Sequence, residues 1–333
     1  MTPREIFLSS VQRGKCDRPC TGSATSIVTT DLMERTGIFF PDAHRNPEAM
    51  AGLAAAGHTL LGFDNVMPLF SVWHESEALG CDVDWGHKGL MPVCGGHLLE
   101  DIHELPDIPA DLLERPGCAV PLAALVLLRK ELGARVSVTG KVFGPWTLAY
   151  HVYGVENFLM ATLTEPDAVR SVLMRLMDVT VAFGRAQIEA GADSLTLGDH
   201  CTRDLCSPDA YEDFLKPVHA ELKRKLGCPV LLHICGDTSD RIPFIAETGT
   251  DCFHFDSKVP AERARALAGH KLALMGGTSN LTTILHGTPA EIEADVLEKL
   301  RCGIDIIGPE CAVPLNAPCS NLALIAETAK RSV

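Results

Sequence analysis

Residues 226–237 read Leu-Gly-Cys-Pro-Val-Leu-Leu-His-Ile-Cys-Gly-Asp, and this stretch contains the local pattern that decides the fold. Gly227 follows a helix-like segment and supplies a left-handed helix cap. The apolar run 230–232 is then typical of a buried strand. The same order of helix, glycine and apolar strand recurs at four other places, at Gly133, Gly191, Gly249 and Gly303. Short loops of this kind join helices to the strands of a parallel sheet.

Eight strand-like runs alternate with helical segments along the chain. We predict strands over 25–29, 60–66, 136–142, 194–199, 230–235, 252–256, 272–277 and 304–308. We predict helices between them, including 47–57, 165–190, 208–226, 238–248 and 289–302. Strand–helix alternation indicates parallel β/α units, so we expect an α/β fold, a (β/α)8 TIM barrel with an N-terminal helical lead-in. A doubly wound open sheet is the alternative, although no Gly-x-Gly-x-x-Gly motif follows any of these strands.

The composition excludes several classes of protein. A net charge of −14 leaves no basic excess to neutralise phosphates, so we expect no nucleic-acid partner. Residues 1–12 contain no apolar core of a signal peptide, and no stretch is apolar for long enough to span a bilayer. We therefore expect no membrane association and a cytoplasmic location. In that compartment the thirteen cysteines are expected to be reduced thiols.

Three residues at predicted strand ends form a candidate metal site. His233 and Cys235 are two positions apart at a strand end, so their side chains point to the same face. Cys311 ends another apolar run, 304–310, and the carboxyl ends of barrel strands meet at one mouth. Two thiolates and one imidazole with an open fourth position are typical of catalytic zinc. We predict His233, Cys235 and Cys311 as the zinc ligands and the catalytic residues.

Ordinary structural roles are the alternative to metal binding for cysteines and polar residues of this chain. Free cysteine is among the most buried residue types, so most of the thiols are expected to be core residues. Cys201 and Cys206 have a spacing that suits a metal, but no second pair accompanies them, and we interpret them as loop or core thiols. Polar side chains also stand at other predicted strand ends, namely Asp64, Asn65, Lys141, Asp199, His200, His254, Asp256, Thr278, Ser279, Asn280 and Glu310.

Five of these polar residues are predicted to bind substrate, and these are Asp199, His200, Asp256, Asn280 and Glu310. Glu310 has a second interpretation, as a residue that supports the neighbouring Cys311 or as a solvated loop charge. His254 lies in an alternating run, 252–256, and is equally typical of an interior histidine with satisfied hydrogen bonds.

The segment His233-Ile234-Cys235-Gly236 resembles the H-x-C-G element of the corrinoid-dependent methyltransferases, the methylcobamide:coenzyme M methyltransferase branch of the uroporphyrinogen decarboxylase superfamily. The resemblance covers nearly the whole chain, with further matching segments at 18–50, 144–149, 207–211 and 303–307. It implies that residues 1–333 form a single uroporphyrinogen decarboxylase-like barrel domain. It also implies that zinc is held by His233, Cys235 and Cys311.

The resemblance further implies a zinc-dependent methyltransferase. The methyl donor would be a methylcorrinoid on a partner corrinoid protein, and the acceptor a small thiol such as coenzyme M. In such an enzyme the metal lowers the pKa of the acceptor thiol so that the thiolate attacks the methyl group.

Two departures keep alternatives open. Residues 19–24 do not form the arginine-rich signature of the decarboxylases, and residues 312–319 differ from the form typical of coenzyme M enzymes. The alternatives are a uroporphyrinogen decarboxylase-type lyase, a corrinoid methyltransferase with a non-thiol acceptor such as tetrahydrofolate, and an inactive corrinoid- or metal-binding accessory protein. The sequence leaves open the original methyl donor, the particular corrinoid protein and the oligomeric state, a homo-oligomer included.

Overall fold

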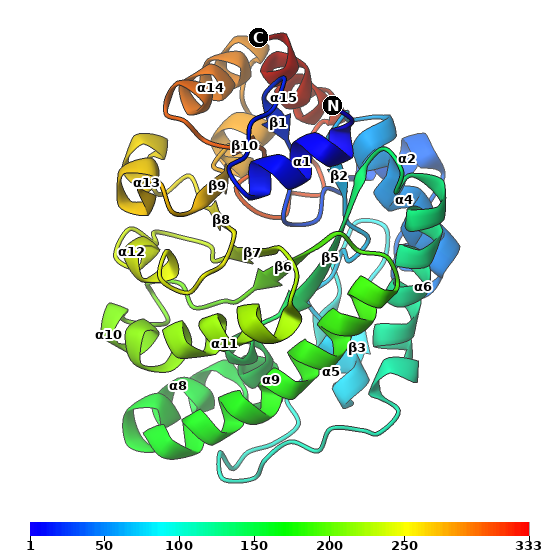
Figure 1. Cartoon of the computed structure of the whole chain (residues 1–333). Helices are drawn as coiled ribbons and strands as arrows, with labels where there is room; N and C mark the ends of the chain where they lie inside the picture. Colours follow the sequence, from blue (N-terminus) through cyan, green and yellow to red (C-terminus); the bar gives the residue numbers. More distant parts are fainter. Residues whose placement is uncertain (333) are drawn as a thin grey trace.

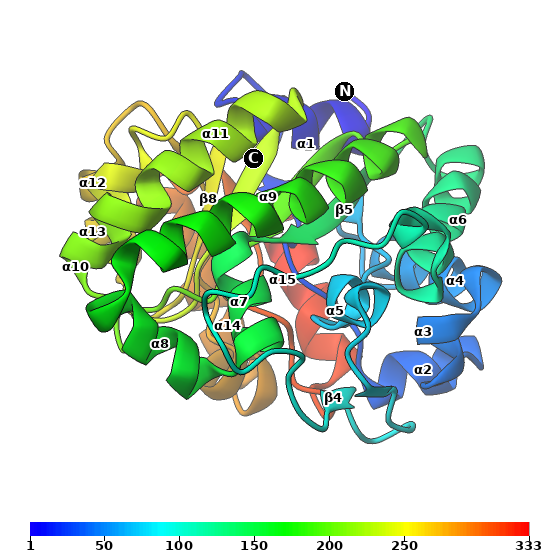
Figure 2. The same ribbon diagram turned by 90° about the horizontal axis from the view of Figure 1, so that it is seen from below.

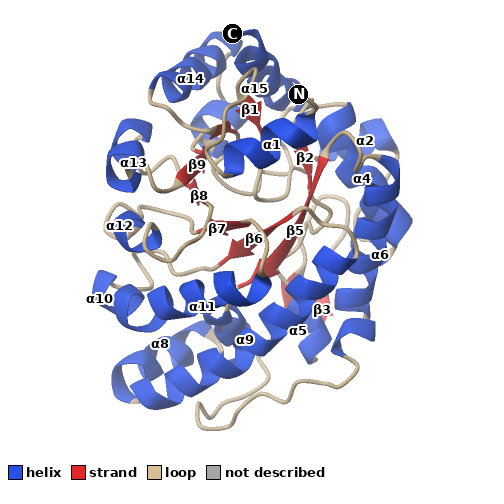
Figure 3. Cartoon of the chain, viewed as in Figure 1, coloured by secondary structure: helices blue, strands red, loops and turns tan. Residues whose placement is uncertain are grey.

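The computed structural model describes residues 1–332, and its centre is a ring of eight parallel strands enclosed by helices (Figure 1, Figure 3). Neighbouring strands pair in the order β1-β10-β9-β8-β7-β6-β5-β2. These strands are β1 (Cys20–Thr21), β2 (Asn65–Val66), β5 (Ser137–Phe143), β6 (Ser194–Gly198), β7 (Val230–His233), β8 (Cys252–Phe255), β9 (Ala273–Gly276) and β10 (Ile306–Ile307). A separate antiparallel hairpin consists of β3 (Val83–Asp84) and β4 (Val93–Cys94).

Helices form the outer layer, and α8, α9 and α11 run side by side along one flank (Figure 2). The first half of the chain contains α1 (Pro3–Val11), α2 (Thr30–Thr36), α3 (Asp42–Arg45), α4 (Pro47–Thr59), α5 (His74–Leu79), the short 3-10 helix η1 (Leu112–Glu114), α6 (Pro116–Glu131), α7 (Pro145–Tyr153) and α8 (Val155–Thr164). The second half contains α9 (Pro166–Glu189), α10 (Pro208–Ala210), the π-helical turn η2 (Tyr211–Leu215), α11 (Lys216–Leu226), α12 (Ile242–Ile245), α13 (Ala261–Ala268), the π-helical turn η3 (Asn280–Leu285), α14 (Pro289–Arg301) and α15 (Cys319–Arg331). Within residues 1–332, no helix has the length and apolar character needed to cross a membrane.

The predicted (β/α)8 barrel with a helical lead-in is confirmed, and the six strands from β5 to β10 lie where the sequence predicts them. The predicted strand at 25–29 is wrong, because the first strand is β1 and residues 25–29 form a loop. Its last residue, Thr29, caps α2 by accepting a hydrogen bond from the backbone N–H of Leu32. The threonines and serines of this segment serve turns and a cap instead of a ladder.

The predicted strand at 60–66 begins too early. Helix α4 continues to Thr59, and a turn through Gly62, with a φ of 79°, precedes β2. Asp64 therefore lies at the amino end of its strand and not at the barrel mouth. The predicted helix at 238–248 is reduced to α12, because Asp237 accepts hydrogen bonds from the backbone and hydroxyl of Ser239 and holds a loop there.

Four of the five predicted glycine caps have left-handed backbones, at Gly191, Gly227, Gly249 and Gly303. The prediction is wrong at Gly133. There α6 ends in an additional tight turn, in which the N–H groups of Arg135 and Val136 both donate to the carbonyl of Leu132. This turn reverses the chain without a left-handed residue.

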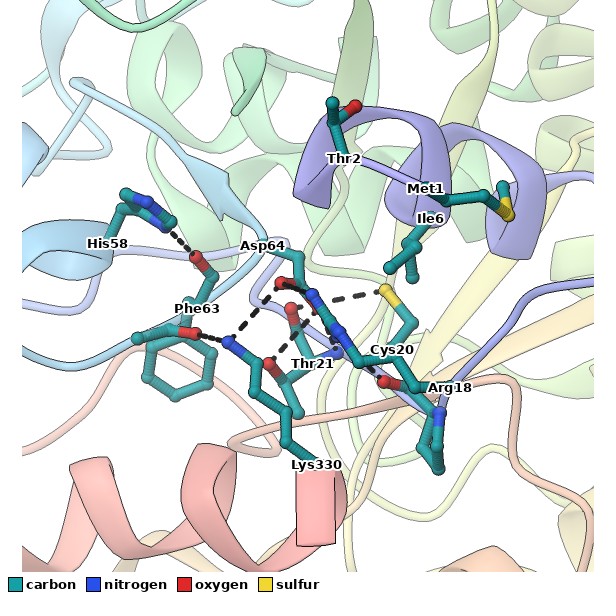
Figure 4. Close-up of polar contacts among 12 residues, drawn as sticks. Met1, Thr2, Ile6, Arg18, Cys20, Thr21, His58, Phe63, Asp64 and Lys330 are labelled. Carbon is teal, nitrogen blue, oxygen red and sulfur yellow. Dashed lines mark hydrogen bonds and ion pairs between the residues drawn. The ribbon is translucent and has the colours of Figure 1, made fainter. Parts of the chain in front are cut away.

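The barrel closes between β1 and β2 through the side chain of Asp64 (Figure 4). The backbone N–H of Asp64 donates to the carbonyl of Thr21 over 2.8 Å, and its carboxylate accepts the N–H of Thr21 over 2.9 Å. Arg18 donates to both carboxylate oxygens, over 2.7 and 2.8 Å, and the ammonium of Lys330 lies 3.4 Å away. Asp64 is fully buried, so this paired carboxylate substitutes for the backbone ladder between two strands of two residues each.

Helix α1 covers the amino ends of the strands. The N–H of Arg4 donates to the carbonyl of Arg135, which precedes β5, and the guanidinium of Arg4 pairs with Asp193, which precedes β6. The apolar face of α1 packs on barrel residues in one buried cluster, made up of Ile6, Phe7, Val11, Cys20, Ala24, Leu231, Cys252, Ala273, Met275 and Ile306. With this end covered, a ligand reaches the barrel interior from the carboxyl ends of the strands.

Candidate metal centre

The structure brings His233, Cys235 and Cys311 into a triangle at the mouth of the barrel. Nε2 of His233 lies 3.1 Å from Sγ of Cys235 and 3.4 Å from Sγ of Cys311, and the two sulfur atoms are 3.3 Å apart. His233 is the last residue of β7, and Cys311 follows β10 in the loop that begins with Pro309. Within residues 1–332, these three form the single group of three or more potential ligands that lie close enough to share a metal ion.

The donor set fits zinc. The ligand atoms of a tetrahedral zinc ion, with bonds of about 2.0 to 2.3 Å, stand roughly 3.5 Å apart, close to the spacing of this triangle. The hydrogen bond from Cys235 lowers the pKa of Cys311, and the neighbouring His233 and His254 act in the same direction. The same contact with Cys311, together with burial, raises the pKa of Cys235. The two thiols therefore share one proton, which a metal ion would displace.

His254 fixes which ring nitrogen of His233 faces the cysteines. Nε2 of His254 lies 2.7 Å from the carbonyl oxygen of Pro309, which only accepts, so Nε2 carries the proton. Burial lowers the pKa of His254 to about 3, so the ring is neutral and its Nδ1 is an acceptor. Nδ1 of His233 is 2.8 Å from that acceptor and must donate, which leaves the Nε2 lone pair of His233 free for a metal.

A small cavity of about 90 Å³ opens beside the triangle. It is lined by His233 and Cys311, by β5 and β6 side chains, and by the loops after β1 and β2, including Thr25, Phe70, Lys141, Phe143, Thr196 and His200. Binding sites for drug-sized ligands measure roughly 300 to 1,000 Å³, so this one suits a ligand of few atoms.

Among the five residues predicted to bind substrate, His200 lines this cavity. Its ring packs on Phe143, with centroids 5.8 Å apart, and burial lowers its pKa. Asp199 is engaged elsewhere. Its carboxylate accepts the N–H and hydroxyl of Thr147, each over 2.8 Å, and lies 3.1 Å from Nε2 of His219.

The other three predicted residues connect the loops around Cys311. Glu310 accepts the N–H of Asn280 over 2.7 Å and the N–H of Ser257 over 3.0 Å. The side-chain amide of Asn280 donates to the carbonyl of Ala312, and Asp256 accepts the N–H of Gly236 over 2.8 Å. These contacts place the three side chains in the framework that positions the ligand loops.

Two contributors were not assigned to the site by sequence reasoning. His254 had two competing interpretations, and the hydrogen bonds on both of its ring nitrogens make it an interior histidine that also orients His233. Lys141 was noted only as one polar strand-end residue among eleven. The signal that would have distinguished it is its place inside the predicted strand 136–142, because barrel strands are buried and lysine is rarely buried without a partner.

The fold and this geometry define a (β/α)8 barrel with a candidate Cys2His metal centre at its mouth. The chain belongs to the uroporphyrinogen decarboxylase (URO-D) family, whose profile matches residues 2–332. It is similar to the methylated-thiol–coenzyme M methyltransferase of Methanosarcina mazei, with 32% identity over 335 residues that cover 100% of this chain and 90% of that protein.

Two further comparisons agree. A methylcobamide:CoM methyltransferase of Methanosarcina barkeri is 30% identical, over 98% of this chain and 97% of that protein. A solved structure of a methyltransferase from Methanosarcina mazei superposes with a TM-score of 0.96 at 29% identity, and the match covers 99% of each chain.

Proposed function

We propose that this protein is a zinc-dependent methyltransferase that moves a methyl group from a methylcorrinoid, carried by a partner protein, to a small thiol such as coenzyme M. The observation that carries the proposal is the triangle of His233, Cys235 and Cys311 beside a cavity of about 90 Å³. The names of the similar proteins, which act on methylcobamide, coenzyme M or methylated thiols, support the same reaction class.

The residues of this chain have distinct tasks in that reaction. His233, Cys235 and Cys311 would hold the ion, and bound zinc supplies a fourth position at which the acceptor sulfur is held and its thiol pKa lowered. His254 keeps the imidazole of His233 in the required tautomer. The buried walls of the cavity exclude bulk water and aim the sulfur outward, toward a methyl donor docked over the barrel mouth.

Two features count against the decarboxylase-type alternative. A cavity of about 90 Å³ is too small to enclose a tetrapyrrole. The arginines of the N-terminal segment are also engaged, because Arg4, Arg13 and Arg18 pair with aspartates that stand before strands, namely Asp193, Asp305 and Asp64. Arginines held in this way are not available to bind the carboxylates of a substrate at the mouth.

The experiment is a methyl-transfer assay from methylcobalamin to coenzyme M, other small thiols and tetrahydrofolate, with zinc content measured in parallel. We expect about one zinc per chain and transfer to thiols, and we expect Cys235→Ala and His233→Ala to lose both. Cys302→Ala is the matched control, since Cys302 lies at the end of α14, away from the triangle.

Each alternative has its own outcome in this assay. Transfer to tetrahydrofolate and not to thiols would replace the acceptor. Decarboxylation of uroporphyrinogen that survives in Cys235→Ala would establish the lyase. A zinc-loaded protein that transfers to no acceptor would refute the methyltransferase and keep the metal site.

A further inference from the structure

Lys141 is a buried lysine in the wall of the barrel. It lies in β5, where every residue is buried, and only 5% of its own surface is exposed. Lysine is rarely buried without a partner, since removing an ammonium ion from water is costly. A lysine in such a place calls for an explanation in terms of what its charge contacts.

The ammonium of Lys141 has no anionic contact within the described chain. Among residues 1–332, no carboxylate oxygen lies within 4.0 Å of it, and it donates no hydrogen bond. It lies over the ring of Phe143, whose centroid is 5.2 Å away. Glu75, the carboxylate that acts on the charge of Lys141, uses one oxygen to accept the N–H of Phe143, and its other oxygen has no partner.

The protonation states agree with this description. Burial raises the pKa of Glu75 to about 7, so its negative charge is incomplete at neutral pH. Burial lowers the pKa of Lys141 to about 8, which leaves the ammonium mostly charged at the same pH. Glu75 and Cys311 both favour the charged form of Lys141 without contacting it, so an ammonium with no anionic contact among residues 1–332 lines the cavity.

The strand register places the backbone of Lys141 deeper in the barrel than that of His233. Phe143 pairs with Gly198, and Gly198 pairs with His233, so these three residues lie at one level. Lys141 lies two residues before Phe143 on the same face of β5, which is about 6.6 Å along the strand toward its amino end. Lys141 thus lines the same small cavity as His233 and Cys311 of the triangle.

On the basis of the proposed function, we propose that Lys141 binds the anionic group of the acceptor, and that the acceptor is therefore a short thiol with a sulfonate or carboxylate a few atoms from its sulfur. The anion enters first and rests on the ammonium, while the sulfur points back toward His233, Cys235 and Cys311. An ion pair in this low-dielectric cavity selects anionic thiols over neutral ones of equal size and sets the direction of the sulfur.

The first test compares matched acceptors. Methyl transfer is measured with 2-mercaptoethanesulfonate, 3-mercaptopropionate and the neutral 2-mercaptoethanol, for the wild type and for Lys141→Met. We expect the wild type to prefer both anionic thiols in kcat/KM by at least about 10-fold. In Lys141→Met this preference is lost through KM, by about 10- to 100-fold, and transfer to 2-mercaptoethanol changes by less than about 3-fold. The two anionic arms separate sulfonate from carboxylate.

The second test does not depend on turnover. Ethanesulfonate, which has no thiol, is titrated calorimetrically into metal-free wild type, Lys141→Met and the control Lys88→Met. Lys88 is exposed and pairs with Glu34 on the outside of the protein. We expect binding to the wild type and the control, and binding at least about 10-fold weaker to Lys141→Met.

The outcomes separate the two proposals. Lys141-dependent binding of ethanesulfonate without methyl transfer to any thiol would support the anion site and refute the proposed function. Equal kcat/KM for 2-mercaptoethanesulfonate and 2-mercaptoethanol in the wild type would overturn the assignment of Lys141. The same conclusion follows if Lys141→Met keeps the anion preference or binds ethanesulfonate as tightly as the wild type.

Discussion

The Nδ1 atoms of His233 and His254 lie 2.8 Å apart, and this contact, together with the backbone carbonyl of His254 at 3.2 Å from the same Nδ1 of His233, orients the candidate metal ligand. Only one of the two nitrogens can carry a proton while both rings are neutral. The carbonyl of Pro309 takes the single proton of His254 on the opposite side of its ring, so the shared proton belongs to His233. The loop that precedes Cys311 and the backbone of β8 thus favour the same tautomer of a ligand on another strand.

Replacing His254 should weaken metal binding without removing a ligand. In His254→Phe the shorter of two contacts of Nδ1–H of His233 is lost, while the backbone carbonyl of residue 254, at 3.2 Å, remains, and we expect zinc affinity to fall by about 10-fold. Competition with a chromophoric chelator measures the affinity. His58→Phe is the control, because His58 also contacts a backbone carbonyl, that of Phe63 at 2.7 Å, at the end of α4. Equal affinities in the two variants would mean that the hydrogen bond does not orient the ligand.

Glu310 should matter through the loops that it joins. Its two oxygens accept N–H groups from Asn280 and Ser257, in the loops after β9 and β8, directly beside Cys311. In Glu310→Gln one of these N–H groups faces an amide donor, so we expect a loss of about 1 to 3 kcal/mol in the free energy of unfolding and a lower zinc affinity.

Urea denaturation with and without zinc measures both effects of Glu310→Gln. Glu298→Gln is the control, since Glu298 is exposed on α14 and its substitution should change the stability by less than about 0.5 kcal/mol. If Glu310→Gln alters only the KM for the thiol and leaves stability and zinc affinity unchanged, then Glu310 contacts substrate instead.

The parts of the site that sequence could predict are those encoded within one segment. His233 and Cys235 share a face because strand side chains alternate, and Cys311 joins them because parallel strands end at one mouth. The support from His254 depends on where the carbonyl of Pro309 lies, 55 residues away in sequence. No local sequence pattern indicates that these two residues meet. Only the fold therefore distinguishes a histidine that orients His233 from one that merely fills the interior.

The errors at the first two strands have a related cause. β1 and β2 contain two residues each, too few for an alternating or apolar run to be visible. They are held by the buried side chain of Asp64 and its partners and not by an extended ladder. Side-chain bridges of this kind, from Asp64 to Thr21 and from Asn65 to Ser23, have no periodic signature.

Asp64 should accordingly contribute to the free energy of unfolding. Asp64→Asn removes the charge that pairs with Arg18, whose side chain is only 20% exposed, and it weakens the hydrogen bond to Thr21. We expect a loss of about 3 kcal/mol in the free energy of unfolding, since an ion is left partly buried without its partner. Urea denaturation of metal-free protein measures it. The exposed pair of Glu221 and Arg224 provides the control, and Glu221→Gln should cost less than about 1 kcal/mol. Equal costs would mean that the closure does not depend on the ion pair.

Glu75 should make the stability depend on pH in a direction opposite to that of an ordinary ion-paired carboxylate. It is fully buried in α5, and burial raises its pKa in the folded state from 4.5 to about 7. The folded protein therefore holds this proton up to a higher pH than the unfolded chain does. Below the unfolded pKa both states are protonated and the group has no effect. As the pH rises from 4.5 to about 7, the unfolded chain loses its proton more readily, and the folded state is progressively destabilised.

Glu75→Gln removes this penalty and keeps an oxygen for the N–H of Phe143. The stability of Glu75→Gln minus that of the wild type should therefore rise by about 3 kcal/mol between pH 4.5 and pH 7 and then level off. Taking the difference cancels the histidines that titrate in both proteins, and Lys141, with a pKa of about 8, stays charged through the window. Urea denaturation at four or five pH values, with Glu298→Gln as the reference, measures the difference. A difference that stays constant with pH would mean that Glu75 is already ionised in the folded state, with Lys141 as its counter-ion, and the charge of Lys141 would then not be free for an acceptor.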